Sequence, residues 1–117
     1  MSTNFVEYNQ HLRELMGALG KEIPQTMGAF TELHKTAGKE GAIDAKTKEL
    51  IALAIAITVR CNGCIAFHVH DAIKMGASRS EIVETIGMAI LMGGGPSVVY
   101  GTEALEAFNQ FEKSGVK

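Results

Sequence analysis

The chain has 117 residues, of which 46% are hydrophobic and 21% charged, and its net charge is −2. This length allows one domain with a hydrophobic core, and the apolar fraction argues against intrinsic disorder. The small net charge gives no reason to expect nucleic acid or an anionic membrane as partner, and two cysteines cannot build the disulfide framework of a small secreted domain.

The sequence gives no sign of secretion or membrane insertion. The start, MSTNFVEYNQHLREL, has no basic segment followed by an apolar one, so we expect no signal peptide. The longest apolar run, LIALAIAITV at 50–59, is about half as long as a membrane-spanning helix requires. We therefore expect a cytoplasmic protein in a reducing compartment, where neighbouring cysteines point to metal binding or catalysis.

Two helices are predicted in the first forty residues. Apolar residues recur at steps of three and four from Phe5 to Leu19, and Gly20 follows as a stop signal. Pro24 suits the first turn of a second helix, whose apolar stripe continues until Gly38.

A third helix is predicted from Asp44, which is a good N-cap, to about Arg60. The run at 50–59 is apolar nearly all round, which in a soluble protein indicates burial on most sides. Because the chain is short, we expect part of this burial to occur against another subunit.

Three further helices complete the predicted fold. One runs from about Asn62 to Met75 and carries both the second cysteine and two histidines. The next begins with a capping box formed by Ser78 and Glu81 and ends at the break MGGGP, and the last covers about 97–111. No segment alternates with the period of a strand, so we predict a single all-α domain of five or six helices spanning residues 1–117.

The stretch VRCNGCIAFHVH at 59–70 concentrates the reactive side chains of the chain. At about 100° per residue, Cys61, Cys64 and His68 share one face of a helix, whereas His70 lies near the opposite face. Cys61 is expected at the helix start, where free N–H groups and the helix dipole favour a thiolate. Cys64 and His68 form an i, i+4 pair, close enough for proton exchange.

Three hypotheses fit this spacing. The first is a dithiol–disulfide redox couple, which can close at a helix N-terminus with little backbone movement. The second is a zinc site with CxxC and HxH as ligands, although the orientation of His70 counts against it. The third is a pair of structural thiols without chemistry. Spacing alone favours the redox couple and leaves the other two open.

Glu49 is a further candidate because it is the last charged residue before the apolar run. It lies on one helical stripe with Leu53, Ala56 and Arg60. If the third and fourth helices pack as an antiparallel hairpin, its carboxylate approaches the cysteine-bearing helix. The alternative is a solvated glutamate in the first turns of the helix, stabilised by the helix dipole.

Taken together, the segment ELIALAIAITVRCNGCIAFH at 49–68 resembles the alkyl hydroperoxidase D-like, or carboxymuconolactone decarboxylase, family. The family signature is a glutamate, a CxxC twelve residues later, and a histidine four residues after the second cysteine, and Glu49, Cys61, Cys64 and His68 match it. The likeness continues through DAKTKEL, EIVETIGMAILMGGGPS and YGTEALEAF and covers roughly residues 25–112.

The resemblance implies an alkyl hydroperoxidase D-like helical bundle and a thiol-dependent peroxidase or disulfide reductase in antioxidant defence. By resemblance, Cys64 attacks the peroxide, Cys61 resolves the sulfenic acid to a disulfide, and His68 and Glu49 transfer the protons. The family further implies a hydroperoxide substrate, a lipoylated protein or dihydrolipoamide as reductant, a peroxiredoxin as possible partner, and a homo-oligomer, either a trimer or a hexamer. No cofactor and no resident metal are implied.

The chain departs from the prototype of the family between the two cysteines. It has Asn62 and Gly63 there, where the hydroperoxidase has a histidine just before the second cysteine. Two alternatives therefore stay open: a decarboxylase-like lyase that uses His68 and Glu49 without thiol turnover, and a non-catalytic zinc-binding or assembly module.

Overall fold

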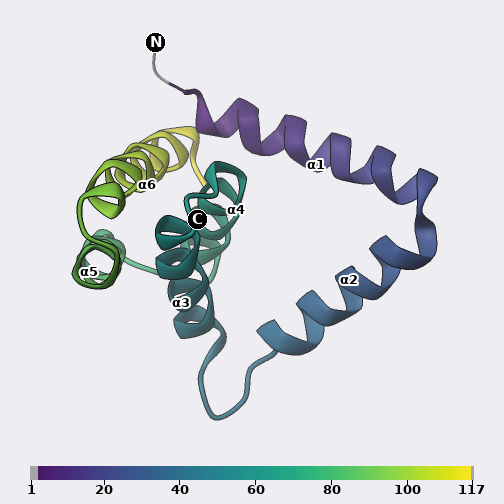
Figure 1. The fold of residues 1–117 in the computed structure, drawn as a ribbon, viewed down its shortest axis with the longest axis horizontal. Coiled ribbons are helices and arrows are strands. Elements are labelled where there is room, and N and C mark those ends of the chain that lie inside the picture. Colours follow the sequence, from purple (N-terminus) through teal and green to yellow (C-terminus); the bar gives the residue numbers. More distant parts are fainter. Residues whose placement is uncertain (1–2, 117) are drawn as a thin grey trace.

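A computed structural model describes residues 3–116 of the chain (Figure 1). This part contains six helices and no strand, which confirms the predicted all-α fold. The helices are α1 (Phe5–Glu22), α2 (Pro24–Gly38), α3 (Ala45–Thr58), α4 (Asn62–Lys74), α5 (Arg79–Gly93) and α6 (Gly95–Ser114). None of them is long and apolar enough to cross a membrane.

Helices α3 to α6 form the body of the molecule. Figure 1 shows α3 and α4 side by side, with α5 and α6 packed along them. The core between these helices is built from aliphatic and aromatic side chains that are almost completely removed from solvent. Its largest fully buried members are Phe5, Leu53, Ile57, Ile65, Val69, Ile82 and Phe111.

Helices α1 and α2 form an arm that reaches away from this body and returns to it (Figure 1). The arm is anchored at its start, where the backbone N–H of Phe5 donates to Oε1 of Gln110 on α6 at 2.6 Å and the Phe5 ring is buried. Helix α2, in contrast, has no buried residue at all. The arm therefore depends on its anchor at α6 and on the packing of α1 across α4 for its position.

The helices begin where the capping residues predict. Asp44 caps α3 by accepting a hydrogen bond from the backbone N–H of Thr47 at 2.7 Å. Ser78 and Glu81 form the complete capping box at the start of α5. Both predicted N-termini are confirmed, and they fix the entry of α3 and α5 into the body.

Helix ends follow the sequence less closely. Helix α1 continues through Gly20 to Glu22, because a glycine inside a helix weakens it without ending it. Helix α3 ends at Thr58, earlier than predicted, and α6 starts at Gly95, directly after Gly94 with its positive φ of 70°. The glycine-rich break thus shrinks to a single junction residue between α5 and α6.

The apolar run on α3 is not buried on most sides of a single chain, so this prediction is wrong for the subunit by itself. Leu53 and Ile57 are fully buried, but Ile51, Ile55 and Val59 are 44%, 56% and 64% exposed. The three exposed residues are four apart and form one stripe. The body has no helix that covers this side of α3 within residues 3–116.

Candidate functional site

The two cysteines lie at the N-terminus of α4 and are joined by a disulfide bond. Cys61 is the N-cap residue, and its sulfur accepts a hydrogen bond from the backbone N–H of Cys64 at 3.2 Å. The Cα atoms are 5.2 Å apart, within the ordinary range for a disulfide. One free N–H group of the first helical turn, that of Cys64, thus points at the Cys61 sulfur.

A tight turn between α3 and α4 holds Cys61 in this position. Arg60 adopts a left-handed conformation with φ of 62°, which is uncommon for a residue with a side chain. The backbone N–H of Cys61 then donates to the carbonyl of Ala56 at 3.0 Å. This turn makes α3 and α4 the antiparallel hairpin on which the candidate role of Glu49 depends.

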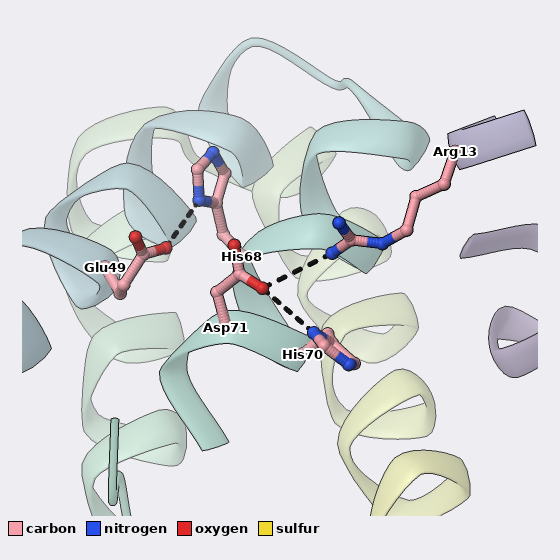
Figure 2. Close-up of polar contacts among 5 residues, drawn as sticks. All are labelled: Arg13, Glu49, His68, His70 and Asp71. Atoms are coloured by element: carbon pink, nitrogen blue, oxygen red, sulfur yellow. Dashed lines mark hydrogen bonds and ion pairs between the residues drawn. The ribbon is translucent and has the colours of Figure 1, made fainter. Parts of the chain in front are cut away.

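Glu49 and His68 meet across this hairpin. Nδ1 of His68 lies 2.8 Å from Oε1 of Glu49, and the two side chains are 20% and 14% exposed respectively. Figure 2 shows the two side chains pointing toward each other. The carboxylate therefore belongs to a polar pair between two helices and is not a solvated residue of the first turns. Because Glu49 engages Nδ1, the Nε2 atom of His68 stays free for other partners.

The disulfide and His68 open into one cavity of about 690 Å³, which we call the disulfide groove. Its walls come from three helices: α1, α2 and the first turns of α4. The lining is mostly apolar, with Leu12, Met16, Phe30 and Phe67, and the charged groups at its edge are Arg13, Lys35 and Asp71. Both cysteines thus line a groove large enough for an organic molecule.

The groove contains one imidazole that the sequence did not indicate. His34 of α2 lines it, and its ring stacks nearly parallel to the ring of His68, with 6.4 Å between centroids and an interplanar angle of 12°. His34 is exposed at its position on α2. Its approach to His68 depends on how the arm returns to the body, and no local spacing encodes that contact.

His70 lies outside the groove, as its helical position predicts. Figure 2 shows its Nδ1 atom paired with Oδ1 of Asp71 at 2.9 Å, on the side of α4 away from Glu49, and its ring packs edge-on against Phe111. Asp71 also receives a contact from Arg13 of α1 at 3.4 Å. No group of three or more His, Cys, Asp or Glu side chains among residues 3–116 is placed to hold a metal ion.

The two residues between the cysteines have separate packing roles. A Cβ on Gly63 would lie 2.7 Å from Cδ2 of Leu12, so the glycine lets α1 pass directly over the start of α4. Asn62 donates from Nδ2 to Oε1 of Glu103 on α6 at 2.9 Å. Burial raises the pKa of the Glu103 carboxyl above its ordinary value, and the nearby Glu106 adds to this increase.

Of the residues proposed from the sequence, Glu49, Cys61, Cys64 and His68 lie together at this site, and their catalytic roles remain predictions. Tyr100 of α6 packs against the core and does not line the groove. Arg13, His34, Lys35 and Asp71 are the charged or imidazole-bearing lining residues that spacing did not identify.

Comparison with known proteins gives consistent matches over most of the chain. The profile of the carboxymuconolactone decarboxylase family matches residues 24–107. A solved structure of a carboxymuconolactone decarboxylase family protein from Legionella pneumophila superimposes with a TM-score of 0.88, at 47% identity, covering 92% of this chain and 96% of that one.

Two further proteins are similar over nearly their whole length. A carboxymuconolactone decarboxylase family protein from Thermotoga maritima, for which a part in an antioxidative response has been suggested, gives a TM-score of 0.72 at 28% identity, with 98% of this chain and 97% of that one covered. An uncharacterized protein from Cupriavidus necator is 37% identical over 93% of each chain.

Proposed function

The chain belongs to the carboxymuconolactone decarboxylase family, and on this premise we propose that it is a thiol-dependent peroxidase or disulfide reductase in antioxidant defence. The observation that carries the proposal is the Cys61–Cys64 disulfide, which opens into the same groove as a histidine bonded to a carboxylate. The role suggested for the Thermotoga maritima relative agrees with this proposal.

In the oxidative half of the cycle, the Cys64 thiolate attacks the terminal oxygen of a hydroperoxide. The O–O bond breaks, an alcohol leaves after gaining a proton, and Cys64 becomes a sulfenic acid. The Cys61 thiol then attacks this sulfur, water leaves, and the disulfide forms. Two thiols and one hydroperoxide thus give one disulfide, one alcohol and one water.

In the reductive half, an external dithiol reopens the disulfide by thiol–disulfide exchange. Cys61 suits the role of leaving thiolate, with the incoming thiol bonding to Cys64, because the N–H of Cys64 points at the Cys61 sulfur and stabilises the negative charge that develops there. A dihydrolipoamide group, free or on a lipoylated protein, is the reductant that the family suggests. The reduced dithiol would in turn reduce the disulfide of a peroxiredoxin, the protein partner that the family suggests.

The Glu49–His68 pair is proposed to accept the proton from the Cys64 thiol. The two residues are hydrogen-bonded, and His68 lines the groove one helical turn after Cys64. A histidine oriented by a carboxylate is a common arrangement for activating a nucleophile. The pair holds the proton between two half-buried groups until solvent in the groove removes it.

This proposal is tested by following the thiols directly. The protein is reduced with a dithiol, freed of it, mixed with a hydroperoxide, and quenched with an alkylating agent, so that intact mass reports the remaining thiols. We expect wild type to lose two thiols per hydroperoxide, and Cys61→Ser and Cys64→Ser to stop turnover with dihydrolipoamide. Full turnover by the double variant would refute the thiol mechanism.

A second candidate is a decarboxylase-like lyase. It is favoured by the Glu49–His68 pair, because the hydrogen bond of this pair involves neither sulfur. The pair could act on a carboxylic acid bound in the groove. Activity that survives alkylation of both cysteines would select this candidate. Loss of all activity on alkylation would select the redox function.

We propose that the protein acts as a cytoplasmic homo-oligomer, either a trimer or a hexamer. Two features support the oligomer: helix α2 has no buried residue, and large apolar side chains are exposed on the arm and on α3. Such surface in a monomer is a common mark of a protein interface.

A further inference from the structure

We infer that His34 is the acid that protonates the oxygen leaving from the hydroperoxide, an inference that rests on the proposed function. The observation is that α2 brings a second imidazole into the disulfide groove, opposite the ring of His68. The family signature contains no residue of α2.

The fold itself does not require an imidazole at position 34. Helix α2 buries none of its residues, and the side chain of His34 forms no hydrogen bond or ion pair with another described residue. Four residues of α2 line the groove, namely Phe30, Thr31, His34 and Lys35, at helical spacing. His34 is therefore on the inner side of α2, with its ring nitrogens free to bind a molecule in the groove.

The neighbouring His68 is assigned a different proton, the one that the Cys64 thiol loses. Its Nδ1 atom is bonded to Glu49, and both side chains are mostly removed from solvent. The pair suits the acceptance of the Cys64 proton, whereas the His34 side chain is exposed to solvent. The ring centroids are 6.4 Å apart and both residues line the groove, so one small molecule there can contact both side chains.

The reaction needs a proton at two separate places. Cys64 loses one before it attacks, and the departing alkoxide must gain one, because an alkoxide is a poor leaving group. In the step assigned to His34, the Cys64 sulfur bonds to the terminal oxygen, the O–O bond breaks, and the His34 imidazolium gives its proton to the alkoxide. The products are an alcohol, a sulfenic acid and a neutral His34, which solvent reprotonates.

The test compares two peroxides that differ in their need for a proton. With tert-butyl hydroperoxide the leaving group is an alkoxide, whereas with peracetic acid it is acetate, which leaves readily without protonation. Reduced protein is mixed with each peroxide and quenched by alkylation, and the rate constant of thiol loss is measured. For His34→Ala and His34→Gln we expect a loss of about 100-fold with tert-butyl hydroperoxide and less than about twofold with peracetic acid.

The matched control is His11→Ala, because His11 is also an exposed helical histidine but does not line the groove. It should leave both rates unchanged. Added imidazole should restore part of the tert-butyl hydroperoxide rate in His34→Ala. Helical content is measured by circular dichroism, and the glutamine variant keeps the test valid if the alanine variant is less stable.

Two results would overturn the role of His34 alone: equal losses with both peroxides, which indicate a structural or binding effect, and rates that do not change with either. A wild-type protein that is inert to both peroxides would instead refute the proposed peroxidase function, and the role of His34 with it.

Discussion

The carboxylate of Glu49 is half-buried in the hairpin of α3 and α4, and its single hydrogen-bond partner there is His68. A carboxylate leaves bulk water only when a partner compensates the loss of solvation. The pair also fixes the orientation of the His68 ring, because Nδ1 is held by Glu49. Glu49 is therefore part of a half-buried polar contact with His68 and is not an exposed charge.

Replacing Glu49 with Gln keeps the shape and the possibility of a hydrogen bond but removes the base. We expect the oxidation of Cys64 at neutral pH to slow by about 100-fold, because general base catalysis contributes this order of magnitude. Stability should change little, since the amide still bonds to the imidazole. The rate is measured by alkylation quench, with Glu84→Gln, an exposed glutamate of α5, as the control. An unchanged rate would mean that Glu49 only stabilises the hairpin.

The site residues that lie on one helix were predictable from the sequence. Cys61, Cys64 and His68 belong to one helix start, so their common face follows from helical geometry alone. Glu49 required the further assumption of a hairpin, which the turn at Arg60 provides. His34 was out of reach, because its contact with His68 joins residues 34 positions apart through the return of an arm.

At the scale of helices, the start of α5 is tied to the start of α3. Glu81 completes the capping box with Ser78 and also forms an ion pair with Lys46 at 2.8 Å. The hydrogen bond from Lys46 is the main reason that the pKa of Glu81 lies below its ordinary value, and the hydrogen bond from the backbone of Ser78 adds to it. One carboxylate thus fixes two helix termini relative to each other.

This link predicts a defined pH dependence of stability. Because the folded state lowers the pKa of Glu81, its contribution is complete above the pKa of an unfolded glutamate and disappears as the pH falls through the lower, folded value. Glu81→Gln should therefore lower the unfolding temperature at pH 7, and the difference from wild type should vanish in acid. Thermal unfolding followed by circular dichroism at several pH values measures this. A constant difference at all pH values would show that the charge of Glu81 is not responsible.

A second prediction at this scale concerns the close contact between α5 and α6. A Cβ on Gly101 would lie 2.7 Å from Cγ2 of Ile86, a methyl group next to the helix backbone that cannot turn away easily. Overpacking costs about 1–3 kcal/mol, which exceeds the gain in helix propensity. We therefore expect Gly101→Ala to lower the free energy of unfolding by roughly 1 kcal/mol.

The control for this contact is Gly17→Ala, because nothing lies within 4 Å of a Cβ at that position of α1. It should raise stability by up to about 1 kcal/mol through helix propensity. Urea unfolding measures both variants. If both substitutions changed the free energy of unfolding equally, a clash between Ile86 and a Cβ at position 101 would not be the cause.

The number and type of elements were predictable because capping residues and the helical period are local signals. Asp44 and Ser78 marked helix starts correctly, and the glycine-rich break marked the junction of α5 and α6, whereas Gly20 did not end α1. The path of the arm was not predictable, because it depends on contacts such as that of Phe5 with α6, more than a hundred residues away in the sequence.

At the scale of the whole molecule, many large apolar side chains are exposed on the single chain. They lie on the arm, on the outer stripe of α3, on α5 and at the start of α6. Prominent members are Leu15, Leu19, Phe30, Leu33, Ile51, Ile55, Val59, Met88, Leu91, Met92, Val98 and Val99. Large exposed apolar side chains in such number are a common mark of protein interfaces, and we expect other subunits of the same chain to cover them.

The stripe on α3 gives the sharpest test of this assembly. Ile55 lies at its centre, 56% exposed in the subunit, so a charge there should not disturb the fold. In an interface, the same charge would be buried without a partner, which costs several kcal/mol. We expect wild type to sediment as a trimer or hexamer and Ile55→Glu as a smaller species with unchanged helical content.

The matched control is Gln10→Glu, which adds the same charge at an exposed polar position of α1. Analytical ultracentrifugation of all three proteins at equal concentration measures the assembly. A wild-type monomer would contradict the oligomer directly. An Ile55→Glu variant with the wild-type mass would show that subunits meet elsewhere, on the arm, on α5 or at the start of α6, where the remaining exposed apolar side chains lie.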